Sequence, residues 1–133
     1  GKIIVRRAKD GEAITTLDGK PHTLTADMLV IADAEAPSCL AGIMGGLNSE
    51  IKADTTDLFL ECAKFRRDSV RRTARALGMR TESSARFEKG VDIAGVEYAM
   101  ERALQLIDLS LEEAQNRKTR EKRPAYEGSL ALA

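Results

Sequence analysis

Aromatic residues make up only 4% of this 133-residue sequence, and tryptophan is absent, so its core must be aliphatic. The two cysteines, Cys39 and Cys62, have no CxxC neighbour, and with the single histidine, His22, they cannot form a standard zinc site. We therefore expect no metal site, and we expect both thiols to be free and buried in a cytosolic protein.

Several functional signatures are missing as well. No apolar run is long enough to span a bilayer, and no signal peptide is recognisable, so we expect no membrane partner. The GxSxG, Walker lysine-loop, HExxH and GxGxxG motifs do not occur. His22, beside Pro21, is interpreted as an exposed turn residue and Cys62 as a core residue, rather than as catalytic groups. The first residue is Gly1 instead of methionine, so we expect a piece of a larger protein.

Charge is balanced over the whole chain but not along it. The sequence has 21 basic and 21 acidic residues, yet eight Lys/Arg and only three Asp/Glu lie between Arg66 and Lys89. A basic segment in a neutral domain suggests an anionic partner such as nucleic acid, although a solvated helix face is the commoner explanation. The charge pattern alone leaves both interpretations open.

With 43% hydrophobic and 32% charged residues, the composition is that of a soluble globular domain. Apolar patterning and turn residues predict an α+β fold, with an antiparallel or mixed sheet of about five or six strands and two amphipathic helices packed on it. The expected strands are residues 2–8, 13–17, 20–24, 28–32, 39–44 and 58–63. The first three should form one small antiparallel sheet, with a hairpin turn at Asp18-Gly19.

Two helices are expected after these strands. The first should begin with Asp68 as its N-cap and end at Gly78. Its inner face carries Val70, Thr73, Ala74 and Leu77, and its outer face carries Arg71, Arg72 and Arg75. The second should span about residues 92–107, with a buried stripe formed by Ile93, Val96, Met100, Ala103, Leu104 and Ile107. Residues 109–133 are expected to be a charged, flexible tail beyond a domain of residues 1–108.

Glu61 interrupts the apolar run Leu58–Ala63, and a carboxylate in a buried strand needs a partner. Composition favours an internal ion pair with Arg80 or Arg86, whereas the functional alternative is a carboxylate that binds a ligand hydroxyl or ammonium group. The pair Gly45-Gly46 indicates a tight turn or, alternatively, a pocket wall.

The hydroxyl-rich loop at Thr81, Ser83 and Ser84 has a structural interpretation too, in which it caps the helical turn that follows.

Three segments together are specific enough to indicate a family. They are TLDGKPHTLTADMLVIADAEAPSCLAGIMGGLNSEI, TTDLFLECAKF and GMRTESSARFEKGVD. These segments, within about residues 3–107, resemble the editing module of the bacterial phenylalanine–tRNA ligase beta chain, its combined third and fourth B-domains. Residues after Asp108 do not resemble the family.

The resemblance implies a function and partners. The whole enzyme, two alpha and two beta chains in the cytoplasm, would use ATP and Mg²⁺ to attach phenylalanine to tRNA(Phe). The editing module would hydrolyse mischarged tyrosyl-tRNA(Phe), because a hydrophobic site rejects an added hydroxyl poorly. By resemblance, Glu61 recognises the tyrosine hydroxyl, and Gly45, Thr81 and Ser83 line the same pocket. No protein nucleophile is implied. Arg71, Arg72 and Arg75 are candidates for tRNA contact.

Two departures from the family pattern qualify these expectations. Ser83 stands where the family usually has alanine. The family segment that carries the pocket's histidine and neighbouring polar residues is expected to precede this sequence, and His22 does not match that histidine. We therefore expect the chain on its own to hydrolyse tyrosyl-tRNA(Phe) poorly. The alternatives to an editing enzyme are a non-catalytic module that binds tRNA or an amino acid, and a structural spacer.

Overall fold

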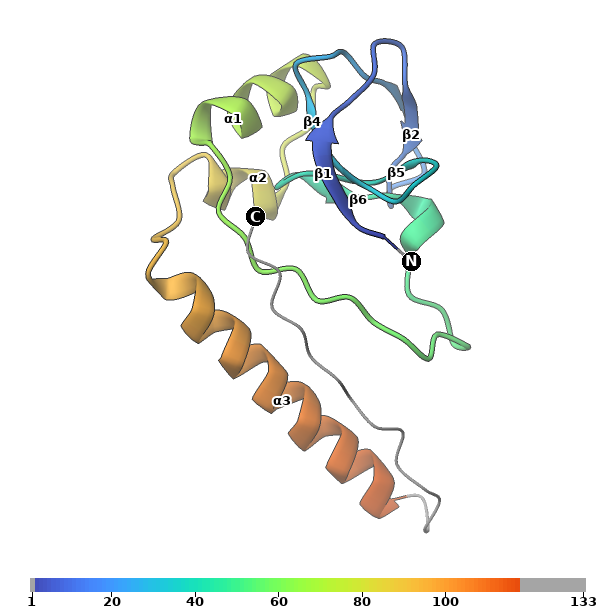
Figure 1. The fold of residues 1–133 in the computed structure, drawn as a ribbon, viewed down its shortest axis with the longest axis vertical. Helices are drawn as coiled ribbons and strands as arrows, with labels where there is room; N and C mark the ends of the chain where they lie inside the picture. The colour runs from blue at the N-terminus through green and yellow to red at the C-terminus, as the bar shows by residue number, and fades with distance from the viewer. Residues whose placement is uncertain (1, 118–133) are drawn as a thin grey trace. The chain divides into compact units, whose positions relative to one another are not determined.

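The structure is a computed structural model that describes residues 2–117. Its main sheet has four antiparallel strands, in the spatial order β1 (Ile4–Arg7), β4 (Leu29–Ala32), β5 (Pro37–Leu40) and β6 (Met44–Gly45). A second sheet is the hairpin of β2 (Ala13–Thr15) and β3 (Pro21–Thr23). The helices are the 3₁₀ turn η1 (Leu47–Ser49), α1 (Arg67–Ala76), α2 (Glu82–Phe87) and α3 (Gly95–Arg117). The α+β class is thus confirmed, with the expected number of strands divided between two sheets (Figure 1).

Strand β4 is the centre of the main sheet. Its residues Val30, Ile31 and Ala32 are all buried, as expected for an apolar strand covered on both faces. β4 is paired along both edges, with β5 on one side and β1 on the other, where Val5 lies opposite Ile31. The expectation that the first 25 residues form one sheet is therefore wrong, because β1 pairs with β4 and not with β2.

The β2–β3 hairpin forms where the Asp18-Gly19 signal places it. Gly19 adopts a φ of +77°, and Ile14 lies opposite His22. The buried Thr16 forms an isolated bridge with Gly46, which joins the hairpin to the end of β6. His22 is half-buried, and its Nε2 atom is buried without a hydrogen-bond partner among residues 2–117, so the expected exposed turn position is wrong.

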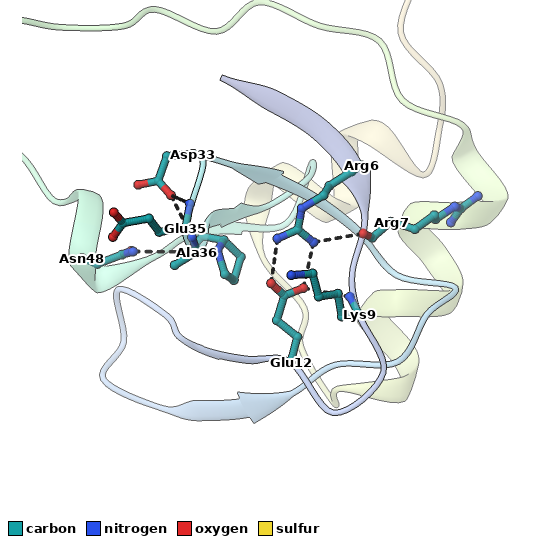
Figure 2. A network of polar contacts seen from close by, with 9 residues as sticks. Arg6, Arg7, Lys9, Glu12, Asp33, Glu35, Ala36 and Asn48 are labelled. Carbon is teal, nitrogen blue, oxygen red and sulfur yellow. Dashed lines mark hydrogen bonds and ion pairs between the residues drawn. The ribbon is translucent and has the colours of Figure 1, made fainter. Parts of the chain in front are cut away.

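An ion pair between Arg6 and Glu12 connects β1 to the start of this hairpin. Both terminal nitrogens of Arg6 donate to the Glu12 carboxylate, at 2.7 and 2.8 Å, and the Lys9 amide donates to the same carboxylate at 2.8 Å (Figure 2). The hydrogen bonds from Arg6 are the main reason that the pKa of Glu12 falls to about 2. Neighbouring Arg7 reaches the other way and donates to the Ser69 hydroxyl of α1 at 3.4 Å.

The expected strand 39–44 is interrupted by a turn. β5 ends at Leu40 and β6 begins at Met44, and Gly42 between them has a φ of +72°. A Cβ atom on Gly42 would lie 2.8 Å from Cδ2 of Phe65 and 3.2 Å from Cγ2 of Val70. The turn requires glycine at this position because the core side chains beneath it leave no room for a Cβ atom.

The largest departure from expectation concerns residues 58–63, which do not form a strand. Between η1 and α1 the chain is extended, and no backbone hydrogen bond joins residues 57–64 to another described segment (Figure 1). Leu58 and Phe59 are 54% and 65% exposed. A strand needs a neighbouring edge as well as an apolar pattern, and no described edge is paired with this segment.

Helix α1 has the expected inner face, since Val70, Thr73 and Ala74 are buried. The helix ends at Ala76, and Gly78 follows its C-cap as expected, with a φ of +63° and an amide that donates to the Arg75 carbonyl at 3.1 Å. The helix begins at Arg67 and its N-cap is Arg66, so the expected cap at Asp68 is wrong. The Asp68 carboxylate instead accepts hydrogen bonds from the Arg66 guanidinium at 3.1 and 3.2 Å.

The core lies where the main sheet meets α1 and α2. Phe65 packs on Phe87 with their ring centroids 4.9 Å apart. The buried hydrophobic residues are Ala8, Ile14, Leu24, Met28, Val30, Ile31, Ala32, Leu40, Ala41, Ile43, Phe65, Val70 and Ala74.

The chain divides into two compact units at residue 96, and α3 is the described part of the second. α3 continues to Arg117, past the expected boundary at Asp108. Ile93 lies before this helix and is 69% exposed, so its place in a buried stripe is wrong. The rest of the expected tail, residues 118–133, lies outside the described residues. No helix within residues 2–117 is long and apolar enough to cross a membrane.

Candidate functional site

Thr81 is held against the turn between β5 and β6. As the N-cap of α2, its hydroxyl accepts the Ser84 amide at 3.0 Å, while the Ser84 hydroxyl bonds the Thr81 amide at 3.0 Å. The same Thr81 hydroxyl donates to the Ile43 carbonyl at 2.8 Å. The capping interpretation is therefore confirmed for Thr81 and Ser84, and the cap also fixes α2 to the turn.

Ser83 lies on the same side of the turn. Its hydroxyl donates to the Gly42 carbonyl at 3.0 Å. With their hydrogens committed to Ile43 and Gly42, the hydroxyls of Thr81 and Ser83 retain lone pairs only, so both can accept but not donate a further hydrogen bond.

Gly45 and Gly46 differ in how closely their surroundings approach. A Cβ atom on Gly46 would lie 2.9 Å from the Ser38 carbonyl oxygen, so this position admits only glycine. A Cβ atom on Gly45 would lie 3.2 Å from Cδ1 of Leu17, an exposed side chain that can move. The tight-turn interpretation of this pair is wrong, because the turn is at Gly42. Position 46 is glycine because the Ser38 carbonyl oxygen lies too close to its backbone for a Cβ atom.

Glu61 is brought near this hairpin from the extended segment. The pKa of the Cys39 thiol is raised to about 12, mainly by burial of Cys39 and secondly by the negative charge of Glu61. Cys39 lies opposite Gly45 in the β5–β6 pair. The Glu61 residue as a whole is exposed, yet nearby protein desolvates its carboxyl group enough to raise the pKa. Cys39 is the neighbour that the sequence did not reveal, because its place beside Gly45 follows from strand pairing.

The expected internal ion pair of Glu61 does not form. Among residues 2–117 its carboxylate has no salt bridge or hydrogen bond. Arg86 is paired with Glu82 at 3.6 Å, and Arg80 has no carboxylate partner in the same range. Within the described part of the chain, Glu61 is thus a partly desolvated carboxylate with no cation to neutralise it.

The predicted site residues therefore fall into two groups. Gly45, Thr81 and Ser83 meet around the β5–β6 hairpin, with Glu61 close to the same hairpin. The three arginines lie apart from it on the exposed face of α1. Of these, Arg72 is paired with Asp68 at 3.7 Å, whereas Arg71 and Arg75 line a hollow between the helices.

The sequence reasoning missed Gly42, which supports the site through its carbonyl. Its signal was a glycine inside an apolar run, a pattern that often marks a bulge or a close approach.

No group of three His, Cys, Asp or Glu side chains within residues 2–117 is placed to hold an ion.

Fold and site together define an α+β domain in which a carboxylate, unpaired within residues 2–117, and two fixed hydroxyls lie near one hairpin. The chain belongs to the B3/4 domain family, whose model matches residues 1–110. It is 56% identical over 106 residues to the phenylalanine–tRNA ligase beta subunit of Carboxydothermus hydrogenoformans, covering 80% of this chain and 13% of that protein.

Two further relatives carry the same name. The proteins of Syntrophus aciditrophicus and Geobacter sulfurreducens are 52% identical over 107 residues and 55% over 105, covering 80% and 79% of this chain. The chain spans 13% of the length of each of these relatives. The predicted kinship with the beta chain is confirmed.

Proposed function

We propose that this chain is part of the beta subunit of a phenylalanine–tRNA ligase, within the module that hydrolyses mischarged tyrosyl-tRNA(Phe). The observation that carries the proposal is the state of Glu61. A partly desolvated carboxylate without a cation partner in the described chain lies near a hairpin that gathers Gly45, Thr81 and Ser83. Such a group gains most from a ligand that donates a hydrogen bond to it.

Tyrosine supplies that donor and phenylalanine does not. The phenol hydroxyl donates to a Glu61 carboxyl oxygen, whether or not the carboxyl group is itself protonated. A phenylalanine ring in the same place would displace water from Glu61 and leave it without a partner, which costs about 1–3 kcal/mol or more for a charged group. A site built in this way separates the two amino acids better than an apolar pocket does.

Ester hydrolysis in this site uses water as the nucleophile. The water oxygen bonds to the carbonyl carbon of the tyrosyl ester, and the bond from that carbon to the ribose oxygen breaks. One proton of the water passes to the ribose oxygen, so free tyrosine and the tRNA hydroxyl are the products. Thr81 and Ser83 contribute as acceptors that orient the water, because their own hydrogens are held by the turn carbonyls. Positioning of this kind is the main catalytic contribution that we assign to them.

A tyrosine ring that approaches Gly45 needs space that Leu17 now partly fills. Because Leu17 is 46% exposed, its side chain can rotate away at small cost. Gly45 then offers backbone without a side chain, which is the role we propose for it.

The remaining parts of the proposal concern the whole enzyme. We assign to it the ATP- and Mg²⁺-dependent charging of tRNA(Phe), an alpha-chain partner in an assembly of two alpha and two beta chains, and a cytoplasmic location. The second candidate function is a non-catalytic module that binds tRNA. The basic hollow beside α1 favours that candidate, and it is compatible with editing.

The test is Glu61→Ala in the full-length two-chain enzyme. We expect hydrolysis of tyrosyl-tRNA(Phe) to fall about 10- to 100-fold, the equivalent of one lost hydrogen bond to a charged group. Phenylalanine charging should not change. The matched control is Glu50→Ala, which removes another exposed carboxylate of the same loop region.

Unchanged tyrosine clearance in Glu61→Ala would remove the role given to Glu61. Loss of both clearance and charging would point to a structural spacer. The same hydrolysis assay with the 133-residue chain tests our expectation that it acts poorly on its own.

A further inference from the structure

A basic hollow of about 490 Å³ lies between α1, the end of α2 and the loops that follow them. Five of its nine lining residues are cationic and one is acidic. The cations are Arg67, Arg71, Arg75, Arg80 and Lys89, and the acid is Glu88. Ala74 and Met79 are its only apolar lining residues, so the hollow offers little surface to an apolar ligand.

The cations of the hollow differ from other arginines of the same segment. Arg66 and Arg72 are both paired with Asp68, and Arg86 is paired with Glu82. In contrast, the four lining cations Arg71, Arg75, Arg80 and Lys89 form no salt bridge with any residue of the described chain. A solvated helix face would spread its charges outward, whereas these converge on one concave surface from more than one segment.

The hollow is also held in shape by the fifth cation. The Nε atom of Arg67 donates to the Glu88 carbonyl at 3.3 Å, which ties the start of α1 to the end of α2. Gly90, with a φ of +101°, leaves room for the Arg67 side chain to reach Glu88, because a Cβ atom on Gly90 would lie 3.1 Å from Cδ of Arg67. This hydrogen bond connects two of the segments that carry the lining cations.

We propose that this hollow binds the phosphodiester groups of a nucleic-acid strand. Converging like charges repel one another, and a polyanion removes that repulsion and releases its own counterions. Planar guanidinium groups match phosphate oxygens in a two-point geometry, which favours arginine over lysine in such a site. The identity of the strand rests on the proposed function, which makes it the acceptor end of the tRNA. The lining cations bind it, and Arg72 does not.

The test uses a fluorescein-labelled RNA hairpin that has the tRNA(Phe) acceptor stem and carries no amino acid. It measures binding of this hairpin to the whole 133-residue chain. The first variant carries Arg71→Gln, Arg75→Gln and Lys89→Gln. We expect its fluorescence-anisotropy affinity to fall at least tenfold near 100 mM salt. The slope of log K against log salt should become shallower by about one unit for each phosphate group that the variant no longer neutralises.

The matched control carries Lys2→Gln, Lys52→Gln and Lys64→Gln, three exposed lysines without a salt bridge in the described chain. Its net charge changes by the same amount, so it measures long-range attraction alone. Circular dichroism of both variants checks the fold. Equal losses of affinity in both variants, or no loss in the first, would overturn the proposal.

A competition arm separates an RNA site from a site for a small anion. Inorganic phosphate in the low millimolar range should not displace the hairpin, because it offers one phosphate group at a time. If it displaces the hairpin, the hollow is a small-anion site and the proposal is wrong. The hairpin carries no tyrosine, so this assay does not depend on Glu61. Failure of the hollow and failure of the editing proposal are therefore distinguishable.

Discussion

Replacing Gly42 by alanine tests how the turn that supports the site is held. Gly42 has a φ of +72°, a conformation that costs other residues about 1–2 kcal/mol. The new methyl group would also lie 2.8 Å from Phe65, 3.2 Å from Val70 and 3.3 Å from Phe87. Because Phe65 is only 8% exposed and packs on Phe87, neither ring can simply rotate away.

The two effects add to a predicted destabilisation of about 2–5 kcal/mol, since overpacking a core costs about 1–3 kcal/mol. The control is Gly19→Ala, which has nearly the same φ of +77° but nothing within 4 Å of the added Cβ atom. It should lose only the conformational part, about 1–2 kcal/mol. The difference between the two variants isolates the steric contribution.

Urea unfolding followed by circular dichroism measures both free energies of unfolding, with the m-value as a check on two-state behaviour. A Gly42→Ala variant that is no less stable than Gly19→Ala would refute the argument that core side chains close this turn. A Phe65→Leu change in the Gly42→Ala background should restore part of the loss, because it removes the nearest ring from the new methyl group.

Three further predictions concern single groups. The pKa of Glu12 lies near 2, below its usual 4.5, because of its hydrogen bonds from Arg6. The stability that this pair contributes is therefore complete above about pH 5 and is lost as the pH falls toward 2. In urea unfolding, Glu12→Gln should be less stable than the parent at pH 7, and the difference between the two should be smaller at pH 3. The pKa of Glu61 is raised by desolvation, so its charge lowers stability above pH 4.5; Glu61→Gln should be at least as stable as the parent at pH 7, with a smaller advantage at pH 4. Thr81→Ala loses a cap and the bond to Ile43 and should cost about 1–2 kcal/mol, whereas Thr81→Ser should cost less.

Local chemistry was enough to predict several elements. The Asp18-Gly19 turn and the helix end at Gly78 follow from residues that tolerate positive φ, and both formed as expected. The β4 strand follows from a continuous apolar run, which only a central position in the sheet can bury on both faces.

The failures share a different cause, which is dependence on distant parts of the chain. The segment 58–63 has the composition of a strand, but strand formation needs a partner edge that the local sequence does not specify. Gly42 closes a turn because Phe65 and Phe87 pack beneath it, and neither is near it in sequence.

The candidate site shows the same division. An acidic residue among apolar neighbours was enough to single out Glu61. Only the folded structure shows that no arginine of the described chain neutralises Glu61, and that Glu61 lies near Cys39.

The role proposed for Glu61 is tested most directly by a crystal structure of the full-length enzyme soaked with tyrosine. We predict a tyrosine beside the β5–β6 hairpin, with its phenol oxygen about 2.5–3.0 Å from a carboxyl oxygen of Glu61. A tyrosine at this hairpin whose phenol lies away from Glu61, or a Glu61 carboxylate paired with an arginine of the full-length enzyme, would contradict it.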